Sequence, residues 1–323
     1  MKNATFRQLR VFNAVARHLS FAKAAETLHV SAPAITMQIK ELEAEVGMPL
    51  FERQGRKVSL TTSGEYMLVY ARKMLALLKD AEDAAARLQR IETGKLTIGM
   101  VDTTTYFIPA MLRKFLNEHE GIELVLKVGN RLELIQWLQN SEVDIAIMGS
   151  PSSEIPTRAE PFAANPLVFV ASPDHPLASE SGLKAEDLRQ QSFIVREQGS
   201  GTRNAMEAFF SQARFLPRFS MELHSNDAIK QAVKANLGLS FLSLHTIGLE
   251  LQAKQLCILD VRGSPVVRAW HVVHALSKLL SPAAEAFRYF VLEHGESDLA
   301  AQFGAVRQPR AGGDRKPTCN PHV

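Results

Sequence analysis

Cysteine is scarce in this chain of 323 residues. The only two, Cys257 and Cys319, stand far apart, and neither has neighbours at zinc-ligand spacing. We therefore predict a buried small hydrophobe at Cys257, a plain thiol at Cys319 and no metal site. Long hydrophobic runs are also missing, because no segment approaches about 20 uninterrupted apolar residues and the N-terminus lacks the apolar core of a signal peptide. The sequence predicts a cytoplasmic protein with no membrane partner.

Catalytic constellations are missing as well. Acid–base or nucleophilic chemistry needs convergent carboxylates, histidines or an activated nucleophile. His271 and His274 stand three apart in a predicted strand, so their side chains point to opposite faces. The run GSGT at 199–202 is not a Walker loop, since no Gly-Lys-Ser/Thr follows it. We predict that the chain is not an enzyme and has no cofactor. The alternatives from other classes are an enzyme or a cytoplasmic small-molecule-binding protein.

A large excess of one charge is absent too, since 37 basic and 34 acidic side chains leave a formal net charge of only +3. The distribution of charge is uneven, however. Residues 1–64 carry nine Lys and Arg against five Glu, so a positive field gathers on the N-terminal segment, where a nucleic-acid-binding module would need it. The length and the 46% hydrophobic content allow two or three domains with their own cores.

What the N-terminal segment does contain is the pattern of a helix-turn-helix. Ser20 is a suitable N-cap for one short helix and Ser31 for a second, which has Pro33 in its first turn. In such a unit the second helix lies in the major groove with its N-terminal residues at the base edges. The predicted DNA-binding residues of this helix are Ser31, Ala32, Pro33, Ala34, Thr36, Met37 and Gln38, with Lys40 placed to reach a phosphate.

A basic wing follows the two helices. The segment FERQGRKVSLT is predicted to be a hairpin that turns at Gln54-Gly55 and carries Arg53, Arg56 and Lys57. Such a cluster supplies the phosphate attraction that dominates affinity for duplex DNA. The acidic residues nearby are interpreted as a solvated face; they are Glu41, Glu43, Glu45 and Glu52.

An ordered series of motifs in this region resembles the N-terminal domain of LysR-type transcriptional regulators. The series comprises Phe6-Arg7-Gln8-Leu9-Arg10-Val11-Phe12, Ala24-Ala25, Pro33-Ala34, Pro49-Leu50-Phe51-Glu52-Arg53 and Leu60-Thr61-Thr62-Ser63-Gly64-Glu65. Family members often carry glutamine before the proline, where this chain has Ala32, so one base contact is missing here. The resemblance implies double-stranded promoter DNA as the partner, and RNA polymerase is a possible further one.

A long helix is predicted over 62–92, with Thr62-Ser63-Gly64-Glu65 as a capping box. Its apolar residues recur at alternating four- and three-residue steps; they are Met67, Ala71, Met74, Leu78, Ala81, Ala85 and Leu88. That heptad seam predicts dimerisation through this helix, although a single helix packed on its own domain could show the same stripe. The family resemblance also implies a homodimer or homotetramer.

The body over 95–295 alternates strand and helix patterns, which predicts an α/β fold with a mainly parallel sheet. Two similar units and a late return segment fit a two-lobed clamp of the periplasmic-binding-protein type, as the resemblance also implies. Lobe I would comprise about 95–165 and 267–295, and lobe II about 166–266. The predicted architecture is thus an all-α winged helix-turn-helix domain over 1–61, a linker helix and an effector-binding α/β domain. A last helix is predicted over 282–293, and the polar tail over 296–323 is expected to be disordered.

Three segments of the body could bind an anion, because each follows a strand and opens a helix. They contribute the hydroxyls of Thr103, Thr104 and Thr105, the polar pair Asn130 and Arg131, and the group Arg196, Ser200, Gly201, Thr202 and Arg203. Simple helix capping is the alternative at each segment. Three such segments on facing lobes favour an effector site.

A finer resemblance, over nearly the whole chain, is to the Calvin-cycle (RuBisCO operon) branch of the family. Its motifs include Tyr106-Phe107-Ile108-Pro109, Val128-Gly129-Asn130-Arg131 and Asn226-Asp227-Ala228-Ile229. The resemblance implies control of carbon-fixation genes by a phosphorylated or reduced metabolite such as NADPH, ribulose bisphosphate or phosphoenolpyruvate. A LysR-type regulator of another operon with a different effector is the alternative. The effector, the operator and the choice between activation and repression are left open.

Overall fold

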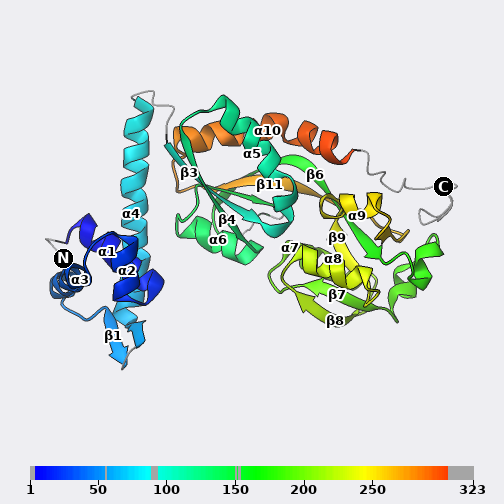
Figure 1. Ribbon diagram of the computed structural model, residues 1–323, viewed down its shortest axis with the longest axis horizontal. Helices are drawn as coiled ribbons and strands as arrows, with labels where there is room; N and C mark the ends of the chain where they lie inside the picture. Colours follow the sequence, from blue (N-terminus) through cyan, green and yellow to red (C-terminus); the bar gives the residue numbers. More distant parts are fainter. Residues whose placement is uncertain (1–3, 55–56, 89–93, 150, 152–153, 305–323) are drawn as a thin grey trace. The chain divides into compact units, whose positions relative to one another are not determined.

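The computed structural model describes residues 4–54, 57–88, 94–149, 151 and 154–304. The chain divides into two compact units, Met1–Arg90 and Ile91–Val323 (Figure 1). No helix among the described residues is long and apolar enough to cross a membrane. Cys257 is buried, as predicted, while Cys319 lies outside the described residues.

The N-terminal unit consists of four helices and a two-stranded wing. Its elements are α1 Phe6–His18, α2 Phe21–Thr27, α3 Ala32–Val46, β1 Phe51–Gln54, β2 Lys57–Leu60 and α4 Thr62–Leu88. The predicted caps are confirmed, since Ser20 accepts from the Lys23 N–H and Ser31 from the Ala34 N–H. Between α2 and α3 the chain turns through His29, whose φ of 53° is left-handed. The predicted helix-turn-helix and wing are therefore present.

The predicted cap of α4 is wrong by one residue. Thr61, and not Thr62, accepts from the Gly64 N–H at 3.0 Å. Its hydroxyl also donates to the Pro49 carbonyl at 2.7 Å. A hydroxyl can accept and donate at once, so Thr61 both starts the helix and ties it to the segment before the wing.

The predicted seam of α4 is also only partly available for another chain. Met67 and Ala71 belong to the core of their own unit, and Met74 packs against it. Of the predicted seam, Ala81 is exposed. The exposed large apolar residues among those described in the helix lie outside the predicted seam: Tyr66, Val69, Tyr70 and Leu77. The side chains of Ala85 and Leu88 lie outside the described residues. The heptad spacing therefore correctly predicts a buried stripe on α4. The first half of that stripe, however, is buried by the helix's own unit.

The C-terminal unit contains a mixed sheet, and the expectation of a mainly parallel one is wrong. The strand order is β10 (Cys257–Ile258), β6 (Thr157–Ala171), β11 (Val266–Ala275), β5, β3 and β4, with β9 (Ser240–Ser243) also paired to β6. Strands β3, β4 and β5 run parallel, while β6 and β11 pair antiparallel with their neighbours. The lobe I elements are β3 Gly94–Val101, η1 Asp102–Tyr106, α5 Ile108–Glu118, β4 Ile122–Gly129, α6 Arg131–Gln139, β5 Ile145–Met148 and α10 Pro282–Phe303.

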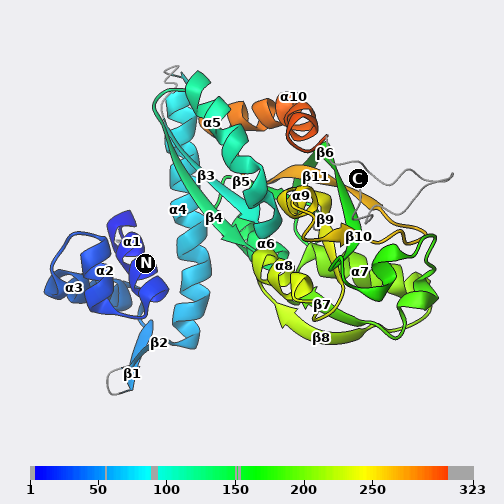
Figure 2. The same cartoon turned by 45° about the vertical axis from the view of Figure 1, so that its right-hand side comes forward.

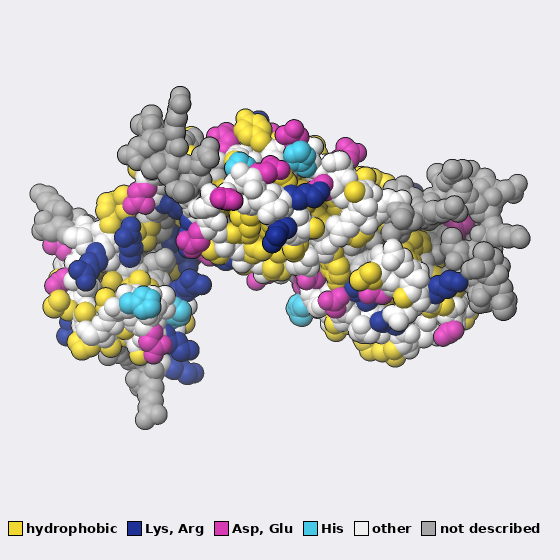
Figure 3. Space-filling model, turned by 45° about the horizontal axis from the view of Figure 1, so that its top comes forward, with side chains coloured by type: hydrophobic (Ala, Val, Ile, Leu, Met, Phe, Trp, Pro, Cys, Tyr) yellow, Lys and Arg dark blue, Asp and Glu magenta, His cyan; other side chains and the backbone are white. Residues whose placement is uncertain are grey.

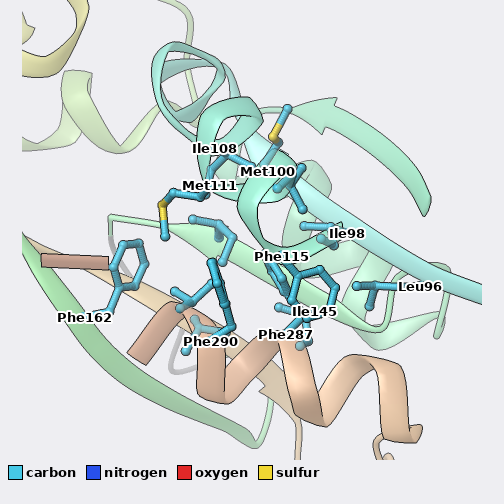
Figure 4. Packing of buried hydrophobic residues seen from close by; sticks show 14 of the residues in the cluster. Leu96, Ile98, Met100, Ile108, Met111, Phe115, Ile145, Phe162, Phe287 and Phe290 are labelled. Atoms are coloured by element: carbon cyan, nitrogen blue, oxygen red, sulfur yellow. The ribbon is translucent and has the colours of Figure 1, made fainter. Parts of the chain in front are cut away.

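Helices cover both faces of the lobe I sheet. Helices α5 and α10 pack on one face, where Phe115, Phe287 and Phe290 meet Ile98 and Ile145 (Figure 4). Helix α6 packs on the other face through Leu134 and Leu138. Figure 2 shows this layered arrangement. The layers leave the carboxyl ends of β3 and β4 open to the cavity described below.

Two long strands connect the lobes. Strand β6 (Thr157–Ala171) pairs with β11 (Val266–Ala275) over ten residue pairs and then continues into lobe II. The remaining lobe II elements are η2 Pro176–Ser179, η3 Ala185–Leu188, β7 Ser192–Arg196, α7 Gly201–Gln212, β8 Arg218–Leu223, α8 Asn226–Lys234, β9 Ser240–Ser243, η4 Leu244–Thr246, α9 Gly248–Gln252 and β10 Cys257–Ile258. Their two cores lie on either side of β6 and β9. Strand β6 thus runs from lobe I into lobe II as one continuous strand.

The last helix is longer than predicted as well. Helix α10 continues through Phe303, so residues 296–303 are not a disordered tail. Leu299 is buried in the lobe I core. Gly295 allows the helix to approach β6 closely, because a Cβ there would lie 2.4 Å from Phe162. Residues 305–323 of the predicted tail lie outside the described residues.

Candidate functional site

The exposed face of α3 carries the predicted DNA-binding residues. Ile35, Ile39 and Leu42 bury the opposite face in the core of the unit. Ser31, Ala32, Pro33, Met37 and Lys40 are exposed, and Ala34, Thr36 and Gln38 are half-buried. Lysine and arginine side chains gather on the visible face of this unit (Figure 3). The helix therefore presents small and polar residues at its N-terminal end, the part that reaches bases in helix-turn-helix proteins.

The wing carries one cation whose side chain the structure describes. Strands β1 and β2 pair antiparallel from Phe51↔Leu60 to Gln54↔Lys57, and Lys57 is exposed. Arg56 and the side chain of Arg53 lie outside the described residues.

The interpretation of the nearby acidic residues as a solvated face agrees with the exposure of Glu41 and Glu52, but Glu43 is half-buried and three of the four carboxylates also accept hydrogen bonds within the unit. Glu43 accepts from the backbone N–H groups of Leu50 and Phe51 at 2.8 and 3.2 Å. Glu52 accepts from the Ser59 hydroxyl across the wing. Glu41 accepts from the side-chain amides of both Gln8 and Gln38. These carboxylates fasten the wing and α3 in place.

We expect Glu43→Ala to destabilise the N-terminal unit. The substitution leaves the N–H groups of Leu50 and Phe51, two buried residues, without their acceptor, which costs about 2–4 kcal/mol of unfolding free energy in total. Differential scanning calorimetry of the full chain measures this as a lower melting temperature of one transition. Glu43→Gln is the matched control, because its amide oxygen still accepts. Equal melting of both variants with the unsubstituted protein would contradict the assigned role of Glu43.

In the C-terminal unit, one cavity gathers seven of the ten predicted effector-binding residues. They are Thr103, Asn130, Arg131, Arg196, Ser200, Gly201 and Thr202. The sequence missed the other lining residues, which are Val101, Met148, Gly149, Asn165, Leu167, Arg268 and Trp270. The lining comes from both lobes and from the two strands that connect them.

Thr104, Thr105 and Arg203 do not line this cavity. The Thr104 hydroxyl donates to the Val101 carbonyl and the Thr105 hydroxyl to the Asp102 carbonyl, so both close the turn of η1. Arg203 is paired with Glu207 at 2.8 Å and with Glu222. The sequence indicated the segments correctly but not which side chains within them turn to the cavity.

Two helix N-termini meet at the cavity. Asn130 is the N-cap of α6 and accepts from the Glu133 N–H, so capping accounts for its side chain. Ser200 is the N-cap of α7, yet its hydroxyl makes no capping hydrogen bond although the residue is buried. Helix N-termini carry a partial positive charge and present unpaired N–H groups, which favours an anion between them.

The arginines of the cavity differ in their pairing. Arg196 is buried, and its guanidinium donates through Nε and Nη2 to the two carboxylate oxygens of Glu197, at 2.8 and 3.1 Å. Its Nη1 lies 3.6 Å from the Asp102 carboxylate. Its charge is therefore already balanced by carboxylates. Arg268 lies in β11 and donates to the Gly201 carbonyl at 3.2 Å. Burial and the neighbouring charge of Arg131 lower the pKa of Arg268.

Arg131 pairs with the exposed carboxylate of Glu154 at 3.6 Å. Two guanidinium groups that repel each other across a cavity are favourable to a ligand of negative charge. The pair Arg131 and Arg268 thus gives the cavity two neighbouring positive charges.

Hydrogen bonds join the lobes beside the cavity. Asp102 of η1 accepts from both the backbone and the side-chain N–H groups of Asn226, at 3.1 and 2.7 Å. Tyr106 donates to Asp227 at 2.7 Å, and burial together with this carboxylate raises the pKa of Tyr106. These contacts hold η1 of lobe I against α8 of lobe II. Among the described residues no group of His, Cys, Asp and Glu could hold a metal ion.

Comparison with known proteins identifies both units. A model of the LysR substrate binding domain matches residues 89–296, and a model of the lysR-family bacterial regulatory helix-turn-helix protein matches residues 6–65. The HTH-type transcriptional regulator CfxR of Cupriavidus necator is 44% identical over 310 residues, which are 96% of this chain and 98% of that protein. The RuBisCO operon transcriptional regulator of Allochromatium vinosum is 47% identical over 290 residues, 90% and 96% of the two chains.

A solved structure is similar to the C-terminal unit. It is the regulatory domain of CcmR from Synechocystis PCC6803 in complex with 2-PG, with 39% sequence identity and a TM-score of 0.60. The match covers 62% of this chain and 97% of that one. The two relatives above are transcriptional regulators, which agrees with the prediction that this chain is not an enzyme. The chain belongs to the LysR family of bacterial helix-turn-helix transcriptional regulators.

Proposed function

We propose that this chain binds promoter DNA of carbon-fixation (RuBisCO or Calvin-cycle) genes and changes their transcription when a small anion occupies the lobe I–lobe II cavity. The observation that carries the effector site is the convergence of two helix N-termini with Arg131 and Arg268. The near full-length similarity to a RuBisCO operon regulator supports the choice of target genes. We further propose a cytoplasmic location and contact with RNA polymerase, both of which rest on the proposed promoter binding.

The effector we propose is a small phosphorylated acid. Phosphate suits helix N-termini and arginine pairs, and the similar CcmR domain was solved with 2-PG, 2-phosphoglycolate. Ribulose bisphosphate, phosphoenolpyruvate and NADPH carry the same group and belong in the same comparison. The ligand can shift the lobes, and through them the DNA-bound state, only by its difference in affinity for the two arrangements.

Fluorescence anisotropy on labelled duplex tests this function. The duplex is taken from the region upstream of the nearest carbon-fixation operon and compared with random duplex, with and without each of the four metabolites. We expect tight binding to the first duplex only and a shift in affinity with at least one metabolite. Equal binding to both duplexes would contradict the choice of target genes. Specific binding that ignores all four metabolites would contradict the proposed effector class.

We also propose that α4 mediates dimerisation, through the exposed stripe Tyr66, Val69, Tyr70 and Leu77. These positions follow the three- and four-residue spacing of one helix face. A pair of such helices buries apolar side chains that a lone helix leaves in water. Two reading helices would then meet successive major grooves of one operator.

The wing gives a prediction for Lys57→Ala. Loss of one phosphate contact should weaken binding to all duplexes alike and reduce the slope of log affinity against log salt by about 1. Anisotropy titrations at several salt concentrations measure the slope. Lys184→Ala, an exposed lysine of the other unit, is the charge-matched control. A loss confined to the operator, with an unchanged slope, would assign Lys57 to base reading instead.

A further inference from the structure

Gln38 of α3 is already hydrogen-bonded within the protein. Its side-chain N–H2 group donates to the carboxylate of Glu41, one turn along the helix, at 3.0 Å. A carboxylate can only accept hydrogen bonds. The amide of Gln38 must therefore turn its nitrogen toward Glu41 and its oxygen away. The hydrogen bond to Glu41 thus determines which way the amide group of Gln38 faces.

Glu41 is itself held in place from the core side. The same carboxylate oxygen accepts from the side-chain amide of Gln8 at 3.1 Å. Gln8 is buried, and its own amide oxygen accepts from the Thr5 N–H at 2.8 Å while its backbone N–H donates to the Thr5 hydroxyl. Thr5 is the N-cap of α1. A hydrogen-bonded series thus runs from the start of α1 through Gln8 and Glu41 to the reading helix.

The series leaves a defined pair of groups on Gln38. An amide nitrogen has two hydrogens, and one of them goes to Glu41. The second hydrogen and the amide oxygen remain, as one donor and one acceptor in the plane of the same amide group. Adenine presents the complementary pair in the major groove, with N7 as acceptor and the N6 amino group as donor. Guanine presents two acceptors, so its O6 would face the amide oxygen of Gln38.

We propose that Gln8 and Glu41 are positioning residues that set Gln38 to read an adenine in the operator. The proposal rests on the proposed DNA binding through α3. Glu41 acts through Gln38 and contacts no base itself. Its role differs from simple attachment of α1 to α3, because attachment alone gives no preference for one base at one position.

The test is selection of bound duplexes from a library in which the operator half-site is randomised, with full-length protein. The unsubstituted protein should prefer adenine by about tenfold or more at one position of each half-site. Glu41→Ala should reduce that preference to about twofold while other positions keep theirs. Glu41→Gln retains an acceptor oxygen and should keep most of the preference. Gln8→Met releases Glu41 from the core side and should give a partial loss.

Modified bases supply a second readout. Placing 7-deazaadenine at the selected position removes the N7 acceptor, so it should weaken binding by the unsubstituted protein several-fold and leave binding by Glu41→Ala nearly unchanged. Thermal unfolding of each variant shows whether it is folded. A full adenine preference in folded Glu41→Ala would overturn the proposal, as would equal relaxation at every position.

Failure of the proposed function would give a different result from failure of the positioning proposal. If the unsubstituted protein selects no sequence at all, operator binding by this chain is wrong, and the positioning roles are wrong with it. If it selects a sequence and Gln38→Ala selects the same one, promoter binding stands. In that case Gln38 is not the reader, and the positioning proposal alone is overturned.

Discussion

Arg268→Met should lower the affinity of this protein for 2-phosphoglycolate by about 10- to 100-fold, which corresponds to the 1.5–3 kcal/mol of a hydrogen bond to a charged group. Arg268 of β11 lines the cavity, where burial and the charge of Arg131 lower its pKa. A bound phosphate would lie between the two guanidinium groups and remove their mutual repulsion. Methionine keeps the length of the side chain and removes the charge. Isothermal titration calorimetry measures the change.

The matched control for this substitution is Arg158→Met. Arg158 is an exposed arginine on the other connecting strand, paired only with Glu160 among the interactions described. Arg158→Met changes the net charge by the same amount as Arg268→Met, and Arg158 is not among the residues that line the cavity. Operator binding without ligand should stay within about twofold in both variants, because neither residue belongs to the N-terminal unit. Equal ligand affinity in the two variants would contradict the placement of the anion between Arg131 and Arg268.

Arg268 could not have been identified from the sequence as a residue of the cavity. The segment VVRAWHVV predicts a strand with one basic residue, and nothing local says what that residue faces. Its neighbours at the cavity come from α6 and α7, which are brought there by the pairing of β11 with β6 and β5. Segments that open helices, in contrast, are visible locally, and for that reason Thr103, Asn130, Arg131 and Ser200 were predicted. Side-chain pairing then decided that Arg203 turns elsewhere.

The DNA-binding unit was more predictable because its signals are local. N-caps, a proline in the first turn and apolar spacing determine the two helices at Ser20, Ser31 and Pro33. Spacing does not reveal the partner of a buried stripe, however. Met67 and Ala71 pack on their own unit, and the Glu43 carboxylate accepts a hydrogen bond from the backbone just before the wing. A charged residue in a sequence needs either water or a polar partner around it. Only the fold shows which of the two it has.

Tyr70→Asp with Leu77→Asp should convert the protein to a monomer and lower its affinity for the operator by about 100- to 10,000-fold. Both side chains are largely exposed, 59% for Tyr70 and 69% for Leu77, on the face of α4 that does not pack on its own unit. Burial of each in a helix pair contributes about 1.5–3 kcal/mol, and aspartates facing one another add repulsion. A monomer loses the gain from two linked reading helices.

Sedimentation equilibrium gives the oligomeric state, and anisotropy gives the affinities for operator and random duplex. The affinity for random duplex should fall much less than the affinity for the operator, because non-specific binding depends on the phosphate contacts of each unit. Glu82→Gln is the control on the same helix, since Glu82 lies on the side that faces Arg10 of α1. A double variant that stays dimeric would show that another surface holds the two copies together. A monomeric variant with undiminished operator affinity would show that one reading helix is sufficient for operator binding. That result would contradict the proposed placement of two reading helices in successive major grooves.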